Sequence, residues 1–319
     1  MASEKENKVI TINGDAVAPG ENRQVKINIA RLPTGTLIDI PIHVFNAKKP
    51  GPSILVQAGL HGDEINGVET LRRMLQNDLF KIKRGAVIVV PILNIFGFIH
   101  FSRDVPDGKD VNRSFPGTRR GSLASRIAYN YTSEILPQID FGIDLHTGGS
   151  QRHNFPQIRY TAADERSKIL AEAFNAPFCF ASRLIGGSFR KTTFKLGIPT
   201  IVYEAGESMR FNEEAIVKGI QGISNVLVVH KMLSKENGFR KEKSIHFEST
   251  RWIRASRAGM FIPSAVNGKR VSKGEELGVI TDTYAKKSKS IKAPYEGYIF
   301  SINNQAVVNQ GDALFRIGK

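Results

Sequence analysis

Cysteine and tryptophan are nearly absent from this chain, each occurring once among its 319 residues. Because a single cysteine has no partner within the chain, an intrachain disulfide is excluded as a support for the fold. Cys179 lies in the apolar stretch 177–180, which is typical of a small core residue rather than of a nucleophile. This cysteine usage is compatible with a reducing compartment.

Long apolar runs are also missing from the sequence. No stretch reaches the roughly 18 apolar residues that a membrane-spanning helix needs, and residues 1–8 are charged, without the apolar centre of a signal peptide. The sequence therefore predicts no membrane span and no secretion signal, and we expect a cytoplasmic protein. Its 41% hydrophobic and 24% charged residues are typical of a globular chain with a buried core.

Acidic residues are scarce relative to basic ones, with 30 Asp and Glu against 45 Lys and Arg and a net charge of +15. Residues 231–319 hold 17 basic and 8 acidic residues, so they carry nine of these charges. Their clusters at 240–243 and 286–289 lie in polar, turn-like stretches without aromatic residues spaced for base stacking, so nucleic-acid binding is weakly indicated. A solvated basic face is favoured, and attraction of anionic substrates stays open.

The hydrophobic pattern of residues 1–238 indicates an α/β domain. Alternating residues predict strands between about 24 and 58. Helical spacing then alternates with short, continuously apolar segments, which is typical of a sheet covered on both faces. We expect a mixed, largely parallel sheet flanked by helices, with later strands at 86–90, 141–145 and 200–203 and helices at 66–77, 124–136, 163–174 and 212–233.

A different pattern begins near residue 237 and continues to the C-terminus. Short strands with glycine-rich turns replace the helical spacing, and residues 258–280 are weakly repeated at 295–317. Two such units facing each other predict a small β-sandwich or barrel over residues 239–319. The repeat resembles biotinyl and lipoyl carrier domains, but neither half has the attachment lysine. A scaffold, lid or oligomerisation role is therefore favoured, and a homo-oligomer stays open.

Histidine and glutamate at the ends of predicted strands form the strongest chemical signal. His61 and Glu64 follow the apolar strand 54–58, and His146 ends the strand at 141–145. Two imidazoles and one carboxylate are a ligand set that catalytic zinc uses, and ligands collect at the carboxyl ends of strands in α/β sheets. Asp144 lies on the same side of its strand as His146, so it either orients that imidazole or is satisfied by backbone donors.

Two further segments carry charged side chains between and beyond these ligands. Arg103, Asn112 and Arg113 form a clamp for a carboxylate, although Arg113 could instead pair with Asp110 or Asp104 and stiffen its loop. The apolar strand at 200–203 delivers Glu204 into a loop, where a carboxylate could act as a general base. Glu207 is the alternative base, because the pattern does not fix which carboxylate points inward.

The segment after the second histidine is harder to interpret. Arg152, His153 and Arg159 could meet an acidic acyl group, but we favour solvated side chains there. Arg190, in a glycine-containing loop, is a candidate for the lining of the pocket.

Four motifs together resemble one known family. They are Gly-x-His-Gly-Asp-Glu at 59–64, Asp-x-Asn-Arg-x-Phe-Pro-Gly at 110–117, Asp-Leu-His at 144–146 and Glu-x-Gly at 204–206. Their order and spacing resemble the succinylglutamate desuccinylase and aspartoacylase family, a branch of the zinc carboxypeptidase-like fold. The resemblance covers roughly residues 50 to 210, and the C-terminal β domain looks like the one that many bacterial members carry.

The resemblance implies a function and a role for each candidate residue. The family hydrolyses the amide bond of N-acyl amino acids, so a small-molecule N-acyl amino acid would be the substrate. One Zn²⁺ per chain would be bound by His61, Glu64 and His146. Glu204 would be the general base, Arg103 would support the oxyanion, and the substrate carboxylate would be held by Asn112 and Arg113.

Two other function classes stay open. A metallocarboxypeptidase acting on peptides would have a similar metal site. A non-catalytic protein could instead keep the fold and use its basic β domain to bind a partner, such as nucleic acid. An intact set of metal ligands and a retained Glu204 argue against the second alternative, because a decayed site has no chemical need of them.

Overall fold

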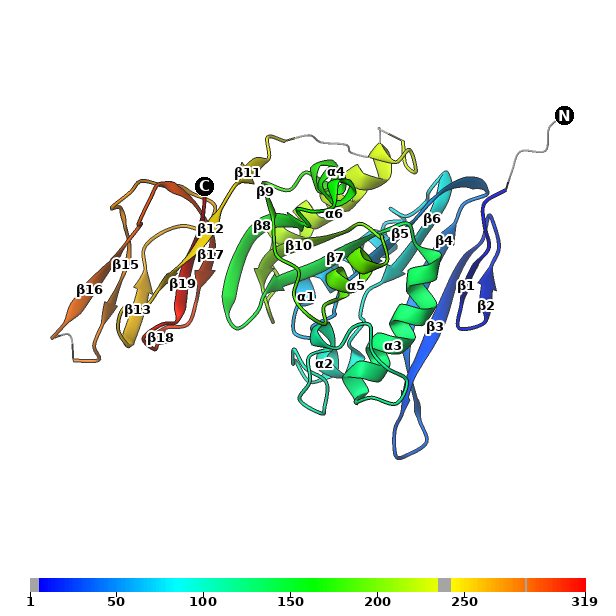
Figure 1. Ribbon diagram of the computed structural model, residues 1–319, viewed down its shortest axis with the longest axis horizontal. Coiled ribbons are helices and arrows are strands. Elements are labelled where there is room, and N and C mark those ends of the chain that lie inside the picture. The colour runs from blue at the N-terminus through cyan, green and yellow to red at the C-terminus, as the bar shows by residue number, and fades with distance from the viewer. Residues whose placement is uncertain (1–5, 235–241, 285) are drawn as a thin grey trace.

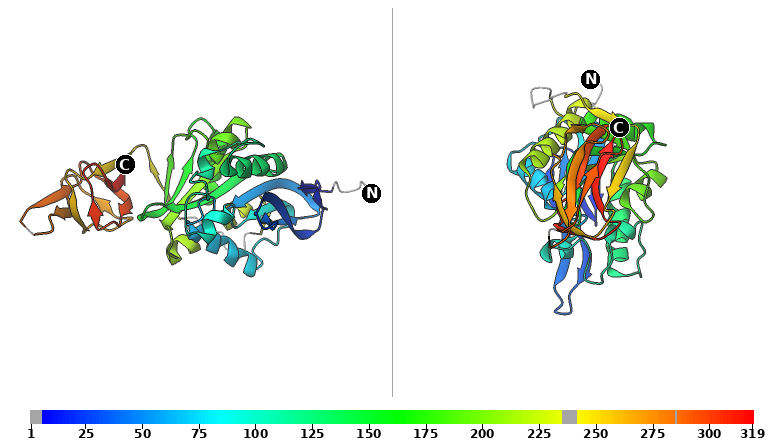
Figure 2. Two further views of the ribbon diagram at one scale, coloured as in Figure 1. Left: turned by 90° about the horizontal axis from the view of Figure 1, so that it is seen from below. Right: turned by 90° about the vertical axis from the view of Figure 1, so that its left-hand side faces the viewer.

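The computed structural model of the protein describes residues 6–234, 242–284 and 286–319 (Figure 1). The predicted domain boundary at 238/239 and part of the basic cluster 240–243 lie outside these residues. The described part of the chain forms a wide sheet that runs through the whole molecule, with helices around one end and further strands at the other (Figures 1 and 2).

The central part of this sheet confirms the predicted α/β class. Strands β6, β5, β7 and β10 are parallel to one another, whereas β4 is antiparallel to both β3 and β6, and β8 is antiparallel to β10. In spatial order these strands are β3 (Asn22–Arg31), β4 (Leu37–Asn46), β6 (Arg84–Val90), β5 (Lys49–Gln57), β7 (Phe141–Gly148), β10 (Thr200–Glu207) and β8 (Arg152–Tyr160). The short strand β9 (Phe178–Ala181) is parallel to β8, and β11 (Ile245–Phe247) is parallel to β9.

Helices cover both faces of this sheet (Figure 2). Alternate residues of β5 enter two different cores: Ile54 and Val56 pack with α1, α4 and α6, and Leu55 packs with α3. This double burial explains why the strand is continuously apolar in sequence. The helices are α1 (Ile65–Gln76), α2 (Ile95–Ile99), α3 (Leu123–Ile135), α4 (Glu165–Phe174), α5 (Phe189–Lys195) and α6 (Glu213–Val229), with 3-10 turns η1 (Val111–Arg113) and η2 (Leu136–Gln138). A small hairpin of β1 (Ile10–Ile12) and β2 (Asp15–Val17) adds to the second core.

The C-terminal strands form the predicted β-sandwich. One sheet contains β16 (Ser288–Lys292), β15 (Glu276–Thr281), β13 (Gly259–Pro263) and β18 (Val307–Val308). The other contains β12 (Thr250–Arg254), β19 (Ala313–Gly318), β17 (Gly297–Asn303) and β14 (Arg270–Val271). The sequence repeat is visible here, because the short strand of each half pairs with the first long strand of the other half: β14 with β17, and β18 with β13.

The β domain is joined directly to the α/β sheet. Strand β17 pairs with β8, with Ser301 opposite Asn154, so one sheet runs from β12 to β3. An aromatic cluster fills this junction with residues from both parts, namely Phe178, Phe180, Phe247 and Phe300. Sequence patterning indicated the sandwich but not the shared sheet.

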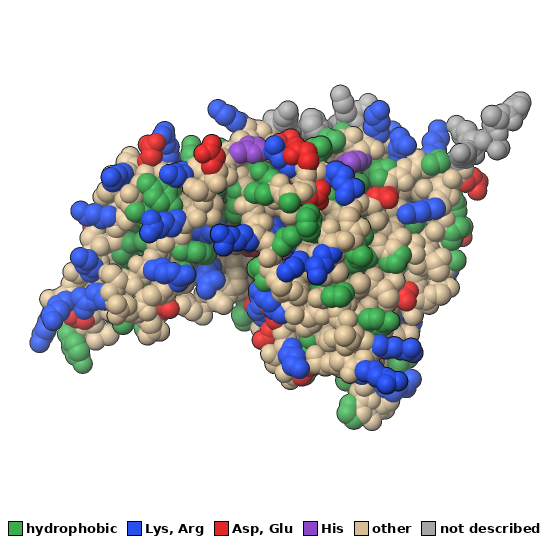
Figure 3. Space-filling model, viewed as in Figure 1, with side chains coloured by type: hydrophobic (Ala, Val, Ile, Leu, Met, Phe, Trp, Pro, Cys, Tyr) green, Lys and Arg blue, Asp and Glu red, His purple; other side chains and the backbone are tan. Residues whose placement is uncertain are grey.

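Cys179 is buried in the first core, as predicted, and burial raises the pKa of its thiol to about 12. Lys and Arg side chains are spread over the β domain at the left of Figure 3, and residues 286–289 are exposed. Within the described ranges, no helix combines the length and the apolar character needed to cross a bilayer.

Candidate active site

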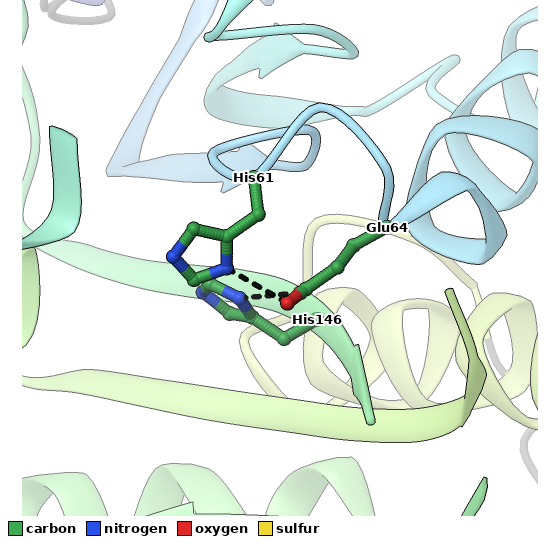
Figure 4. A group of neighbouring side chains, drawn as sticks. All are labelled: His61, Glu64 and His146. Atoms are coloured by element: carbon green, nitrogen blue, oxygen red, sulfur yellow. Dashed lines mark hydrogen bonds and ion pairs between the residues drawn. The ribbon is translucent and has the colours of Figure 1, made fainter. Parts of the chain in front are cut away.

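The three predicted metal ligands lie together at the carboxyl ends of β5 and β7. One donor atom from each of His61, Glu64 and His146 lies within 4.8 Å of the others. Glu64 stands between the two imidazoles, with Oε1 2.8 Å from His61 Nδ1 and Oε2 2.8 Å from His146 Nδ1 (Figure 4). All three side chains are buried. The loop from β5 to α1 carries the first two, since Glu64 immediately precedes α1.

A chain of buried side chains supports His146. Its Nε2 lies 2.9 Å from Asp144 Oδ2, and Asp144 Oδ1 accepts a bond from Gln57 over 3.0 Å. Gln57 in turn accepts from the hydroxyl of Tyr131 on α3 over 2.6 Å. Asp144 therefore contacts the imidazole, the first of the two interpretations that the sequence left open. Burial opposes protonation of His146, but Asp144 and Glu64 outweigh it and raise its pKa well above the ordinary value.

Asp110 has the corresponding place beside His61. Its Oδ1 lies 3.4 Å from His61 Nε2, and its Oδ2 accepts from Arg103 Nε and Nη2 over 3.0 and 2.8 Å. Burial acts against ionisation of Asp110, yet His61 and Arg103 lower its pKa below the ordinary range. Sequence reasoning considered Asp110 as a partner of Arg113, whose Nη1 is 3.8 Å away, and missed its contact with His61.

Arg103 lies next to the predicted metal ligands. Its Nη1 is 3.2 Å from His61 Nδ1 and 3.5 Å from Glu64 Oε1. Because Asp110 binds the other edge of the guanidinium, Nη1 is held at the centre of the site.

Asn112 and Arg113 lie on η1 at the rim of the same cavity. Asn112 Oδ1 accepts from the backbone N–H of Phe189 over 2.9 Å, which leaves its amino group free to donate elsewhere. The loop before α5 packs tightly on this turn: at Gly187, with φ +69°, an added Cβ would lie 2.2 Å from the carbonyl oxygen of Arg113. The loop therefore fixes the backbone beneath both predicted substrate-binding residues.

Strand β10 carries both candidate bases, Glu204 and Glu207, but places them in different surroundings. Glu204 pairs in register with His146 of β7, lines the cavity, and is bound by Asn154 and Arg159 over 2.7 and 2.6 Å. A register shift follows Glu204. Beyond it, Glu207 Oε2 accepts from Asn304 of the β domain over 2.7 Å, and Glu207 does not line the cavity.

These side chains surround a cavity of about 440 Å³ that is rich in arginine. Six arginines line it: Arg103, Arg113, Arg152, Arg159, Arg190 and Arg316. Arg190 lines the cavity, as predicted, but it lies in helix α5 and not in a loop. The preference for a solvated Arg159 was wrong, because its side chain is 20% exposed and ion-paired with Glu204. His153 is held between Asn212 and Asn267 and is not among the lining residues.

The β domain also contributes to this cavity, which sequence reasoning missed. Trp252 of β12 and Arg316 of β19 line its wall. Opposed strands place Trp252 beside Arg316, Arg316 beside Ser301, and Ser301 beside Asn154, so the lining continues across the shared sheet. No local motif marks these residues, because only the pairing of β17 with β8 brings them to the site.

The fold and the site define a class: an α/β protein whose strand ends build a polar cavity around a group of candidate metal ligands. Comparison with known proteins identifies the family. The protein-family model of the succinylglutamate desuccinylase/aspartoacylase catalytic domain matches residues 50–230, more than half of the chain. The chain belongs to this family.

Individual relatives agree with this assignment. The chain is 26% identical to the N-alpha-acetyl-L-2,4-diaminobutyric acid deacetylase of Halomonas elongata, with 86% of this chain and 84% of that protein covered. It is 25% identical to a succinylglutamate desuccinylase/aspartoacylase from Rhodobacter sphaeroides of known structure, with a TM-score of 0.80 and coverage of 94% and 95%. The fold is also that of the ectoine utilization protein EutE (DoeB) from Ruegeria pomeroyi, with 22% identity, a TM-score of 0.83 and coverage of 98% and 99%.

Proposed function

We propose that this protein is a zinc-dependent deacylase that hydrolyses the amide bond of an N-acyl amino acid, releasing a carboxylate and a free amine. The observation that carries the proposal is the buried group of His61, Glu64 and His146 in one cavity with Glu204. Membership of the family and the deacetylase activity in the name of the Halomonas relative support it.

The donor set fits zinc. Two imidazole nitrogens and a carboxylate oxygen are the ligands of many catalytic zinc sites. Each imidazole has a carboxylate near its other nitrogen, Asp144 for His146 and Asp110 for His61, as is usual for metal-binding histidines. A zinc ion bound there would polarise the acyl carbonyl and lower the pKa of a water molecule.

The side chains of the cavity supply the remaining chemistry. Glu204 accepts a proton from the attacking water while the oxygen of that water bonds to the acyl carbon. Glu204 then returns a proton to the amide nitrogen as the carbon–nitrogen bond breaks. Arg103, fixed by Asp110, stabilises the negative charge on the acyl oxygen. Asn112 and Arg113 bind the carboxylate of the amino acid and so position the scissile bond.

The charge of the cavity constrains the substrate. The Halomonas relative is named for a diaminobutyric acid, which carries a second amino group. Six arginines line the cavity of this chain, against three carboxylates, which are Glu64, Asp144 and Glu204. Like charges repel strongly in a partly desolvated site, so we expect N-acyl amino acids without a second ammonium group to be preferred.

Metal analysis combined with an amine-release assay tests the function. The purified protein should contain one zinc per chain and release amine from members of an N-acetyl, N-succinyl and N-formyl amino acid panel. His146→Ala should lose both the metal and the activity. Glu204→Gln should keep the metal and lose about 10²–10⁴-fold in kcat. Glu207→Gln, whose side chain contacts the β domain outside the cavity, is the matched control and should stay active.

Two results would contradict the proposal. Full activity of a metal-free preparation would exclude the zinc mechanism. Release of C-terminal residues from peptides, without hydrolysis of any N-acyl amino acid, would favour a metallocarboxypeptidase.

A further inference from the structure

The cavity wall at the junction with the β domain contains three arginines around one carboxylate. Arg159, Arg190 and Arg316 come from β8, α5 and β19, and Glu204 lies among them. Burial, and then the neighbouring Arg159, lower the pKa of both Arg190 and Arg316 to about 10. Within the described ranges, this group forms one ion pair, between Arg159 and Glu204.

Glu204 is fixed at both carboxylate oxygens. Arg159 Nη1 lies 2.6 Å from Oε1, and Asn154 Nδ2 donates to Oε2 over 2.7 Å. Charge-assisted bonds of this length set the orientation of a carboxylate. Because Glu204 lies opposite His146 on the neighbouring strand, these two bonds determine how the carboxylate is presented to the metal ligands.

Arg159 shares an aromatic ring with a second arginine. Its guanidinium carbon lies 5.7 Å from the centre of the Phe180 ring, and that of Arg316 lies 5.6 Å from the same centre. Both are within the range of a cation–π contact. After burial, the positive charge of Arg159 is the next cause that lowers the pKa of Arg316, so the two guanidinium groups interact electrostatically as well as through Phe180.

Arg316 is anchored within the β domain. Its guanidinium carbon lies 5.2 Å from the ring centre of Phe300 and 5.4 Å from that of Trp252, and Nη2 donates to Thr250 over 3.0 Å. The Nε of Arg159 and the Nε of Arg316 are both buried and have no partner among the described residues. Arg316 is thus held by aromatic rings and one bond to a hydroxyl, whereas Arg159 is held by Phe180 and by its ion pair with Glu204.

We propose that Arg159 is a positioning residue for Glu204 and that the β domain takes part in catalysis by supporting Arg159 through Arg316. The inference rests on the proposed deacylase function, in which Glu204 handles the proton of the attacking water. Arg159 acts by fixing this carboxylate, so its loss affects turnover more than substrate binding. Arg316 acts through Arg159.

Kinetics of the zinc-loaded, full-length protein test the proposal. Arg159→Met should lower kcat by about 10- to 100-fold, with KM changed by less than about twofold, since outer-shell supports commonly contribute this much. Arg159→Lys should recover part of the loss because it retains a positive charge. Added guanidinium chloride, at millimolar concentration, should partly restore kcat in Arg159→Ala. Arg251→Met, an exposed arginine of the same sheet, is the control and should match the wild type.

A double-mutant cycle tests the role of Arg316. Arg316→Met alone should lower kcat, by less than Arg159→Met does, and should have no further effect once Arg159 is methionine. Additive losses would mean that the two residues act independently, and would overturn the support role. Zinc content and thermal unfolding measured on each variant separate positioning from loss of the fold.

The outcomes distinguish this inference from the proposed function. If the wild type hydrolyses no N-acyl amino acid, the proposed function fails. If the wild type is active and Arg159→Met keeps its kcat, only the positioning role fails. An unchanged kcat with a raised KM would make Arg159 a substrate-binding residue and would also overturn it. If Arg159→Met does not fold, Arg159→Lys with a kcat between those of the wild type and Glu204→Gln and an unchanged KM supports the inference, and Arg159→Lys with the wild-type kcat overturns it.

Discussion

Asp110 connects three groups of the site through one carboxylate. It lies beside His61 Nε2, binds two nitrogens of Arg103 and accepts from the backbone N–H of Asn112. Removal of its charge should loosen His61 and Arg103 together. We expect Asp110→Asn to lower zinc affinity by about 10- to 100-fold, the usual effect of losing a carboxylate behind a metal-binding histidine. Competition with a chelator measures this change.

Asp107 provides the control for Asp110, because it lies in the same loop but is exposed and binds only backbone N–H groups in the described structure. Asp107→Asn should keep the wild-type zinc affinity. Equal affinity in Asp110→Asn and Asp107→Asn would show that Asp110 does not orient His61.

Single residues differed in how well the sequence predicted their placement. His61, His146 and Glu204 follow apolar strands, and such strands converge at one edge of a parallel sheet, so the pattern alone indicated that they lie close together. The contacts of Asp110 and Arg159 depend on which loops and strands lie side by side in three dimensions. Nothing in the local pattern of either residue reports that arrangement.

At the scale of elements, strand β8 was the one near the site that the pattern did not predict. Its sequence contains arginine, histidine, asparagine, glutamine and a proline, whereas predicted strands here are apolar or alternating. The structure explains the composition, because part of β8 lines the polar cavity while β10 and β17 pair with its backbone. The strands β5, β6, β7 and β10 and the helices α1, α3, α4 and α6 were predicted because burial determines their pattern.

Helix α1 directly follows the loop that carries His61 and Glu64, so its stability bears on the site. Glu69 accepts hydrogen bonds from Arg72 and Arg73 of the same helix. The hydrogen bond from Arg72 is the largest cause that lowers the pKa of Glu69. Burial acts in the opposite direction, but the bonds from Arg72 and Arg73 outweigh it and lower this pKa to about 2. Because the folded pKa lies below the unfolded value, Glu69 stabilises the fold above about pH 4.5, and this contribution is lost as the pH falls toward 2.

Unfolding in urea tests this contribution. At pH 7 we expect Glu69→Gln to lower the free energy of unfolding by about 1–2 kcal/mol, less than the full pKa shift implies because Arg72 is largely solvent-exposed. The difference from the wild type should shrink progressively below about pH 4.5. Glu172→Gln, at an exposed position on α4, is the control. A difference that stays constant down to pH 3 would assign the effect to packing instead of charge.

At the scale of the whole molecule, the two predicted domains share a sheet. Sequence patterning separated residues 1–238 from 239–319 because helical spacing ends there, and that division stays a prediction. Patterning could not indicate that β17 pairs with β8, since strand pairing over more than 140 positions leaves no local signal. Four phenylalanines from both parts bury the junction, and the β domain lines the cavity with Trp252 and Arg316.

This junction predicts the behaviour of a truncated chain. Without residues 239–319, residues 152–154 of β8 and the strand β9 would each lose a paired neighbour, and Phe178 and Phe180 would lose the packing of Phe247 and Phe300. Exposed edges and apolar patches of this kind promote aggregation. We expect residues 1–238 to be poorly soluble or aggregated in size-exclusion chromatography and to lack deacylase activity. A soluble, monomeric fragment with the wild-type kcat/KM would show that the β domain is dispensable, because neither its strand pairing nor its cavity residues would then be needed.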